Sequence, residues 1–262
     1  MKPVVAVLLA LLAMLAPVRA EALRVVIADD GRFNYMETLV RTAFEAAGQP
    51  VALEVGPLMP QPRVEAALHA GEVTLHPFLR TPARDAQLIP VPAAVTQGLM
   101  GRRILLVRPG DQAKFAAVHS LADLRASRLV GGFGAGWYDL EIWRANGLPA
   151  HGQGGDWQVL YAMVASGQRD VDYLALGAAQ VLYEAAQHPE VAVESGLVLD
   201  YDADLIFYVS PHQPDVARSL SRGMAAIAAD GRLAQLIDRY FGASVRALGL
   251  GHRRVIRLAR PE

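Results

Sequence analysis

The stretch LRVVIADDGRFNYMETLVRTAFEAAGQPVALEV, residues 23–55, decides the fold. It opens with a β-branched run at residues 23–28, which predicts a buried strand. Residues 35–47 then repeat apolar side chains at helical spacing and stop before Gly48, the residue type that most often follows a helix. Residues 51–55 predict a second strand. A strand, a helix and a strand in this order indicate the start of a parallel sheet covered by helices.

The same alternation continues towards the C-terminus. Residues 64–69 predict a second helix, and residues 73–75 predict a third strand. Residues 77–92 are rich in proline and predict an irregular segment before the next strand, at residues 102–107. The β-α-β-α-β order therefore predicts a first α/β lobe.

A second set of strands and helices starts at Ser120, which is placed to cap a helix. The elements expected in this second lobe are a helix at 121–126, a strand at 129–132, helices at 137–146 and 157–166, and a strand at 171–176. After it we expect a strand at 205–209, helices at 214–229 and 233–241, and an edge strand at 254–258.

The predicted fold class is therefore α/β, with two lobes that each have a mainly parallel sheet and covering helices. Two crossing segments, near residues 98–103 and 201–205, join the lobes. We expect residues 21–102 to form the first part of lobe one, residues 103–205 to form lobe two, and residues 206–262 to return to lobe one.

Residues 1–20 have the pattern of a signal peptide. Lys2 is followed by an apolar run at residues 4–15, and small residues at 18 and 20 suit cleavage before Glu21. The alternative is a membrane anchor, but the run is shorter than the ~20 residues that span a bilayer. No cysteine follows the run, so no lipid can be attached there. We expect an exported, soluble periplasmic protein.

The composition argues against several functions. The chain has 25 basic and 26 acidic residues, which does not suit a nucleic-acid binder. It has no cysteine, and no two of its seven histidines have the spacing of a zinc site on a helix, so we predict neither a metal nor another cofactor. No nucleophile motif of a hydrolase occurs. Acid/base chemistry by Asp170 and Asp172 stays open.

The glycine-rich stretch Gly131-Gly132-Phe133-Gly134-Ala135-Gly136-Trp137 follows a predicted strand and precedes a predicted helix. Such a turn can present free backbone N–H groups to an anion or a zwitterion, so Gly134, Ala135 and Gly136 are candidate ligand-binding residues. Trp137 could stack on the ligand or belong to the core. The alternative for the whole stretch is a plain turn. The spacing of the glycines does not fit a dinucleotide-binding motif.

Two further groups lie where parallel strands are expected to end, which is where such sheets bind ligands. The guanidinium of Arg84 could hold a carboxylate, or Arg84 could be a surface residue. Asp29, Phe33 and Tyr35 could receive an ammonium group or a ring, or could serve in a turn and a helix cap. His76 lies near the same region, where a structural role is the simpler interpretation.

The order and spacing of these features resemble the bacterial extracellular solute-binding proteins of family 3, the amino-acid-binding type with the type 2 periplasmic fold. The resemblance spans nearly all of the chain after residue 20. The residues that carry it are Thr81-Pro82-Ala83-Arg84, Leu121-Ala122-Asp123-Leu124, the stretch from Gly167 to Asp172, and Ala228-Ala229-Asp230-Gly231 through Arg239-Tyr240-Phe241-Gly242.

The resemblance implies a receptor that closes its two lobes on a small polar, carboxylate-bearing ligand such as an amino acid. Arg84 would hold the carboxylate, and Tyr173 would join the site from lobe two. The partner would be an ABC transporter permease or a membrane sensor, and the protein would be a monomer. This chain departs from the family at three places. Where the family has hydroxyl residues before the arginine, this chain has His76, Pro77 and Leu79, and where the family has a threonine in the glycine turn, it has Ala135 or Gly136. Gly177 stands where the family has the aspartate that binds the ammonium group.

Two other functions stay open at this stage. One is a periplasmic enzyme on the same scaffold, such as a cyclohexadienyl dehydratase acting on prephenate or arogenate. That activity would need a buried acid in the cleft, and the sequence does not single one out. The other is a sensory or accessory module that no longer binds a solute. The absence of several of the family's amino-acid-binding residues would allow this.

Overall fold

The computed structural model describes residues 22–28, 34–57, 59–167 and 170–261. The predicted signal peptide and the candidate ligand residues Asp29 and Phe33 lie outside these ranges. Within them, none of the helices has both the length and the apolar character needed to cross a membrane.

The first lobe is built on a sheet with the strand order β2-β1-β3-β11-β4. As the sequence predicts, the first strands are parallel, and the returning strand β11 pairs antiparallel with both β3 and β4. The strands are β1 (Leu23–Ala28), β2 (Val51–Gly56), β3 (Leu75–Leu79), β4 (Ile89–Val91) and β11 (Leu205–Val209). The helices of this lobe are α2 (Tyr35–Ala46), α3 (Gln61–Ala70), α4 (Pro82–Asp85), α10 (Pro214–Ala229) and α11 (Arg232–Ile237).

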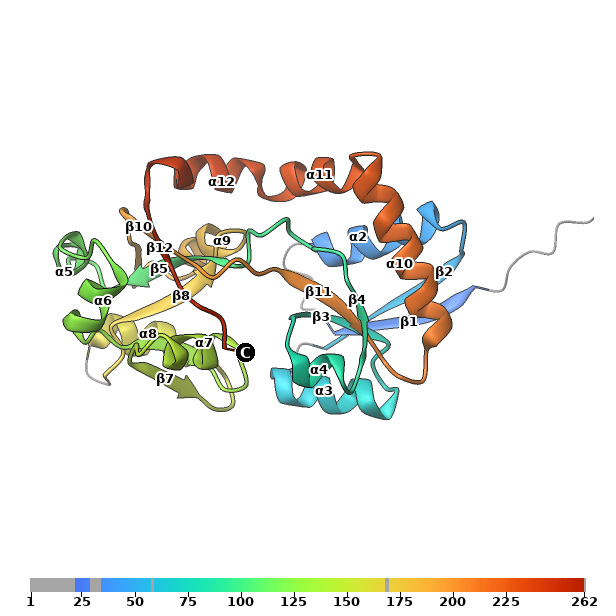
Figure 1. Cartoon of the computed structure of the whole chain (residues 1–262), viewed down its shortest axis with the longest axis horizontal. Coiled ribbons are helices and arrows are strands. Elements are labelled where there is room, and N and C mark those ends of the chain that lie inside the picture. The colour runs from blue at the N-terminus through green and yellow to red at the C-terminus, as the bar shows by residue number, and fades with distance from the viewer. Residues whose placement is uncertain (1–21, 29–33, 58, 168–169, 262) are drawn as a thin grey trace, which may run out of the picture.

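Helices α2 and α10 pack closely against each other over this sheet (Figure 1). A Cβ atom at Gly223 of α10 would overlap with the backbone carbonyl of Ala43 in α2. Only glycine therefore allows the two helices to approach this closely. The apolar stripe that predicted α10 from the sequence faces the core, with Leu220, Met224 and Ile227 fully buried.

The second lobe has a sheet with the order β12-β10-β5-β8-β6-β7, and β9 pairs with β5. Its parallel pairs are β6 with β7, β6 with β8, and β10 with β12, whereas β5 is antiparallel to β8, β9 and β10. The strands are β5 (Arg102–Val107), β6 (Gly131–Gly134), β7 (Ala150–Gln153), β8 (Tyr173–Gly177), β9 (Ala192–Val193), β10 (Leu197–Asp200) and β12 (Arg254–Arg257). The helices are α5 (Gln112–Ala116), α6 (Leu121–Ser127), α7 (Asp139–Ala145), α8 (Val159–Ser166) and α9 (Val181–Gln187).

The predicted return of residues 206–262 to lobe one is wrong at its C-terminal end. After α11, the π-helical turn Asp238–Gly242 and α12 (Ala243–Leu248) carry the chain along both lobes to the second one (Figure 1). A short 3-10 turn, Leu250–His252, then leads into β12, which pairs parallel with β10 in the second sheet. An edge strand carries no sequence signal for the sheet that it joins, because any open edge offers unpaired backbone groups.

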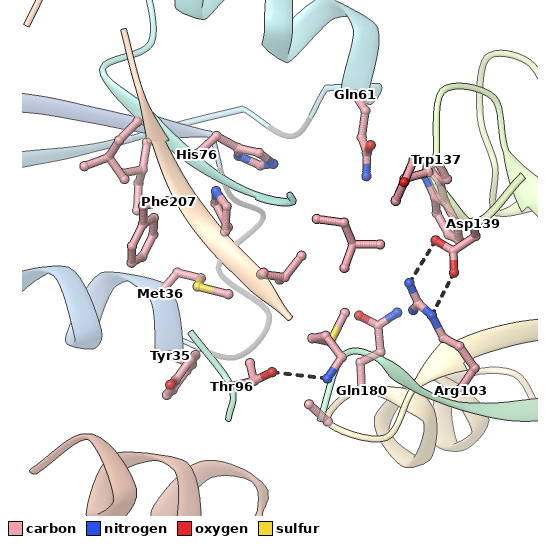
Figure 2. Close-up of a pocket in the computed structure, with 18 of the residues that line it drawn as sticks. Tyr35, Met36, Gln61, His76, Thr96, Arg103, Trp137, Asp139, Gln180 and Phe207 are labelled. Atoms are coloured by element: carbon pink, nitrogen blue, oxygen red, sulfur yellow. Dashed lines mark hydrogen bonds and ion pairs between the residues drawn. The ribbon is translucent and has the colours of Figure 1, made fainter. Parts of the chain in front are cut away.

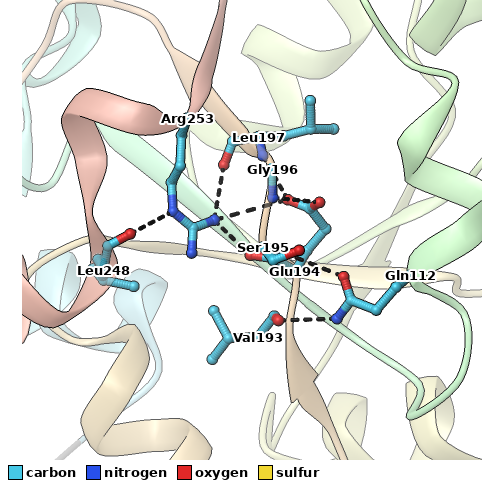
Figure 3. A network of polar contacts seen from close by, with 8 residues as sticks. All are labelled: Gln112, Val193, Glu194, Ser195, Gly196, Leu197, Leu248 and Arg253. Carbon is cyan, nitrogen blue, oxygen red and sulfur yellow. Dashed lines mark hydrogen bonds and ion pairs between the residues drawn. The ribbon is translucent and has the colours of Figure 1, made fainter.

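An arginine with a largely covered side chain fixes this C-terminal segment to lobe two (Figure 3). The Arg253 guanidinium donates to the carbonyl oxygens of Leu248 at 2.8 Å and Leu197 at 3.3 Å. It lies 3.8 Å from the carboxylate of Glu194, which accepts the backbone N–H groups of Gly196 and Leu197 at 2.7 Å each. Burial lowers the pKa of Arg253, and the nearby carboxylate partly offsets that effect.

The segment 77–92, predicted to be irregular, contains the end of β3, the short helix α4 and the strand β4. Proline disfavours a strand because it cannot donate to a neighbour. Pro77 is tolerated because β1 pairs with β3 only at Leu75, which leaves β11 as the partner beyond that point. Pro90 is tolerated because β4 is the edge strand of its sheet.

The two crossing segments contact each other between the lobes. A Cβ atom at Gly101 in the first segment would overlap with the backbone carbonyl of Ala203 in the second. Gly101 is thus required by the close approach of the two chains.

Candidate ligand site between the lobes

A cavity of about 250 Å³ lies where the two lobes meet, and both lobes supply its walls (Figure 2). Its lining is mostly apolar and aromatic, with a few amide, imidazole and charged groups. Lobe one and the crossing segments contribute Ile27, Tyr35, Met36, Gln61, Leu75, His76, Pro77, Leu79, Arg84, Thr96, Met100, Leu205, Phe207 and Phe241. Lobe two contributes Arg103, Trp137, Tyr138, Asp139, Trp157, Ala179, Gln180 and Glu184.

The predicted carboxylate-binding residue Arg84 does line the cavity. The Thr81 side chain accepts the Arg84 backbone N–H at 3.2 Å, which caps the short helix α4. The Arg84 side chain is buried, and its guanidinium already contacts Glu65 of α3 at 2.7 Å. Two further N–H groups donate to the carbonyl of Leu79 at 2.9 Å and to the amide oxygen of Gln61 at 3.4 Å. The sequence identified the arginine but not the carboxylate that pairs with it.

Tyr35 also lines the cavity, but its hydroxyl is engaged by the protein. It donates to the backbone carbonyl of Val95, and the ring packs edge-on against Tyr240 and Phe241. Burial, followed by the charge of Asp204, raises the pKa of Tyr35 well above its usual value, so the phenol stays protonated. The structure therefore gives Tyr35 a packing role at the wall of the cavity.

The glycine turn is less available to an anion than predicted. The backbone N–H of Ala135 donates to the backbone carbonyl of Gln153 at 2.7 Å. The backbone N–H of Trp137 donates to the backbone carbonyl of Gly134 at 3.1 Å. The following helix α7 begins only at Asp139 and has seven residues. Of residues 134–137, which are all described, Trp137 is the one that lines the cavity.

Gly136 makes a contact between the lobes instead. It has a φ of +83°, and a Cβ atom there would lie 3.0 Å from the Pro62 side chain of α3. A left-handed backbone that faces a neighbour this closely favours glycine. The turn thus brings lobe two against the first turn of α3, next to Gln61.

Tyr173, expected to join the site from lobe two, does not lie at the cavity. Tyr173 is fully buried in the core of lobe two and does not line the cavity. Its hydroxyl accepts the indole N–H of Trp143 at 2.8 Å, and its ring packs edge-on against Phe115. Alternation along β8 turns this side chain into the core of lobe two. The sequence of the strand alone does not show which of its two faces lies in the core and which lies at the cleft.

Sequence reasoning missed a buried polar network beside the cavity. The Arg103 guanidinium lies 2.8 Å from a carboxylate oxygen of Asp139 and donates to the Tyr201 hydroxyl at 2.6 Å. That hydroxyl in turn donates to Asp139 at 3.0 Å. Arg103 and Tyr201 lie at the lobe-two ends of the two crossing segments. The network therefore ties both segments to Asp139 at the start of α7. An arginine at the start of the buried run RRILLV was the available signal.

The charges in this network are stabilised by one another. Burial is the largest single effect and lowers the pKa of Arg103, but Asp139 and Tyr201 together raise it by more, so the net direction is up. Burial raises the pKa of Tyr201 well above its usual value. The arginine therefore stays charged and the phenol stays protonated, and the Asp139 carboxylate is held by both.

A buried acid, Glu184 of α9, also reaches the cavity. Its carboxylate accepts the hydroxyl of Tyr161 at 2.7 Å. Tyr161 stacks on His188 and continues an aromatic row through Trp157 to Trp137 at the cavity wall. Among the described residues, no group of three acidic or histidine side chains is arranged to hold a metal ion.

No protein-family model and no curated protein sequence matches this chain. Solved structures do match its fold. An amino-acid ABC transporter substrate-binding protein, AbpA of Streptococcus pneumoniae bound to L-arginine, is 17% identical with a TM-score of 0.60 over 85% of this chain and 96% of that one. The GluR0 ligand-binding core of Nostoc punctiforme with L-glutamate is 17% identical with a TM-score of 0.58 over 84% and 99%.

A third match is an ancestral amino-acid-binding protein described as a precursor of cyclohexadienyl dehydratase. It is 15% identical with a TM-score of 0.61, over 83% of this chain and 95% of that one. At these identities the likeness concerns the fold. The chain has the two-lobed α/β fold of the periplasmic solute-binding proteins, and its cavity lies where the two lobes meet.

Proposed function

We propose that this protein is a periplasmic solute-binding protein that captures a small, amino-acid-like ligand between its lobes. The observation that carries the proposal is the cavity walled by both lobes, to which the two crossing segments contribute Met100 and Leu205. A ligand there touches both lobes and so binds better to the closed arrangement than to an open one. Binding would thereby shift the population towards closure. The solved proteins with this fold support the proposal, since three of them are described as amino-acid-binding or bound to an amino acid.

Four groups are best placed to contact the ligand. The Arg84 guanidinium would hold a carboxylate by exchanging its contact with Glu65 or Gln61 for the ligand. Trp137 offers an aromatic face from lobe two. Gln61 and Gln180 extend amide groups towards the cavity from opposite lobes (Figure 2). An amide both donates and accepts hydrogen bonds, so each can serve a neutral or a charged head group.

The wider setting belongs to the same proposal. We expect export through the signal peptide at residues 1–20, a monomer, and a partner that is either an ABC transporter permease or a membrane sensor. We expect the partner to bind the closed form, because the two lobes together present a surface that the open form lacks.

The direct test measures ligand binding by residues 21–262. Thermal unfolding is followed with each of the twenty amino acids at 1 mM, and hits are titrated by calorimetry. A ligand that binds only the folded state stabilises it by about 2.7 kcal/mol at a hundredfold excess over its Kd.

A pair of glutamine variants locates the site. We expect Gln180→Ala to weaken the binding of the best ligand, because its side chain lines the cavity, and Gln158→Ala to leave it unchanged, because Gln158 lies outside the cavity. If no amino acid stabilises the wild-type protein, the proposal fails and the accessory-module hypothesis gains support.

One observation favours a second candidate function. A dehydratase on this scaffold needs a buried acid in the cleft, and Glu184 is such an acid. Incubation of the protein with prephenate or arogenate, followed by detection of the aromatic product, tests it. Turnover that is lost in Glu184→Gln would establish the enzyme, whereas binding without turnover would leave a receptor.

A further inference from the structure

We propose that the cavity selects a ligand with an apolar or aromatic body and against one with a charged side chain. This inference rests on the proposed function and names the class of ligand. It follows from two features of the described lining. The charged groups are already paired within the protein, and most of the remaining surface is apolar.

Neither arginine of the cavity is left for an acidic side chain, because under the proposed function Arg84 would hold the carboxylate of the head group and Arg103 is paired within the protein. Arg84 contacts Glu65 at 2.7 Å and also donates to Leu79. Arg103 contacts Asp139 at 2.8 Å and also donates to Tyr201. An acidic side chain in the body of the cavity would therefore meet either Arg103, whose charge Asp139 balances, or Arg84, which the carboxylate of the head group would already occupy.

The acids of the cavity also have partners in the protein, a guanidinium and a hydroxyl for Asp139 and a hydroxyl for Glu184. Asp139 is shared by the guanidinium of Arg103 and the hydroxyl of Tyr201. Glu184 accepts the hydroxyl of Tyr161 at 2.7 Å. A cationic side chain would have to compete for these carboxylates. Removing a charge from water without a new partner is far more costly than removing an apolar group.

Apolar side chains converge on the space that remains. Leu75 from β3 and Leu205 and Phe207 from β11 form the wall on lobe one, and Trp137 faces them from lobe two. Met36, in the first turn of α2, lines the cavity as well (Figure 2). Met100, in the first crossing segment, completes this surface. Methionine is flexible and polarisable, and it adapts well to flat or branched apolar ligands.

The cavity volume of about 250 Å³ lies just below the range of most small-molecule pockets, which is about 300–1,000 Å³. A compact body of the size of a leucine or phenylalanine side chain suits it. Burial of such a body is favourable in proportion to the apolar area removed from water.

The test uses amino acids that share one head group and differ only in the side chain. L-leucine and L-phenylalanine are compared with L-arginine and L-glutamate by calorimetry on residues 21–262. We expect the Kd of leucine or phenylalanine to be at least tenfold lower than the Kd of arginine and of glutamate.

Tighter binding of arginine or glutamate would overturn the inference and leave the proposed function intact. If none of the four probes binds and another uncharged polar amino acid does, the inference is also overturned. Failure of every amino acid would contradict the proposed function itself, and the inference with it.

A matched pair of methionine variants tests the surface that carries the inference. Met36 lines the cavity, whereas Met59 is half-buried in another cluster of lobe one. We expect Met36→Gln to raise the Kd of the apolar probe about tenfold and Met36→Leu to restore it. Met59→Gln should leave the Kd unchanged. An equal change in Kd for the two glutamine variants would show that the apolar wall does not contribute to ligand selection.

Discussion

The carboxylate of Asp204 accepts a hydrogen bond from the backbone N–H of Thr96 at 2.7 Å. Asp204 lies in the second crossing segment and Thr96 lies just before the first, 108 positions away in the chain. The Thr96 hydroxyl also donates to Asp204, and the backbone N–H of Gly98 donates to it at 3.0 Å. One side chain therefore fastens together two of the three stretches of chain that join the lobes, the third being the C-terminal segment that leads to β12.

We expect Asp204→Asn to lower the free energy of unfolding by about 1–3 kcal/mol, because the new amide has one acceptor oxygen where the carboxylate has two. Its NH₂ group would face backbone donors that the carboxylate now satisfies. Urea unfolding followed by circular dichroism measures the loss.

Asp202→Asn is the matched control. Asp202 is exposed and has a φ of +48°, a conformation that asparagine tolerates well. We expect its effect to stay within about 0.5 kcal/mol. Equal losses in the two variants would contradict the role given to Asp204.

Gly101→Ala tests the close contact between the crossing segments. The new methyl group would overlap with the backbone carbonyl of Ala203, and backbone cannot move aside as a flexible side chain can. We expect a loss of at least about 2 kcal/mol, at the upper end of overpacking effects, seen as a lower melting temperature. Gly154→Ala is the control, since a methyl group there meets no atom within 4 Å. Wild-type stability of Gly101→Ala would show that the segments can separate.

Glu65→Gln tests the pairing that the sequence did not indicate. The variant removes the negative charge beside Arg84 and keeps the shape of the side chain. Under the proposed function, we expect the Kd of the amino-acid ligand to fall about tenfold, which corresponds to about 1.4 kcal/mol. The reason is that the ligand carboxylate would no longer compete with Glu65 for the guanidinium.

The control for this variant is Glu72→Gln, because Glu72 is exposed and lies outside the cavity. Calorimetry with the best amino acid gives both constants. Weaker binding by Glu65→Gln would mean that Glu65 holds Arg84 in place for the ligand and does not compete with it.

The periodic parts of the sequence predicted the fold well. Helix α10 and strands β5 and β11 have the predicted bounds, because each is a regular apolar pattern that ends at a clear break. The short strands β9 and β10 were not predicted, since two to four residues carry no measurable period.

The site was predicted only in part, because its groups come from distant segments. Of the candidate residues, Tyr35, Arg84 and Trp137 line the cavity, and their contact with a ligand stays a prediction. The carboxylate that pairs with Arg84 lies 19 positions away, and the network of Arg103 joins residues up to 98 positions apart. No local pattern connects such positions, so their partners become visible only when the sheets are assembled.

The fate of Tyr173 can be tested in the same terms. Tyr173→Phe removes the hydroxyl that accepts the indole N–H of Trp143 and leaves that buried donor without this partner. We expect the free energy of unfolding to fall by about 1–3 kcal/mol, with a change in tryptophan fluorescence. The Kd of the ligand should not change, because Tyr173 lies in the core of lobe two and not at the cavity. Unchanged stability with a weakened ligand would restore the role that the sequence suggested, and would require β8 to turn this side chain towards the cleft when the lobes close.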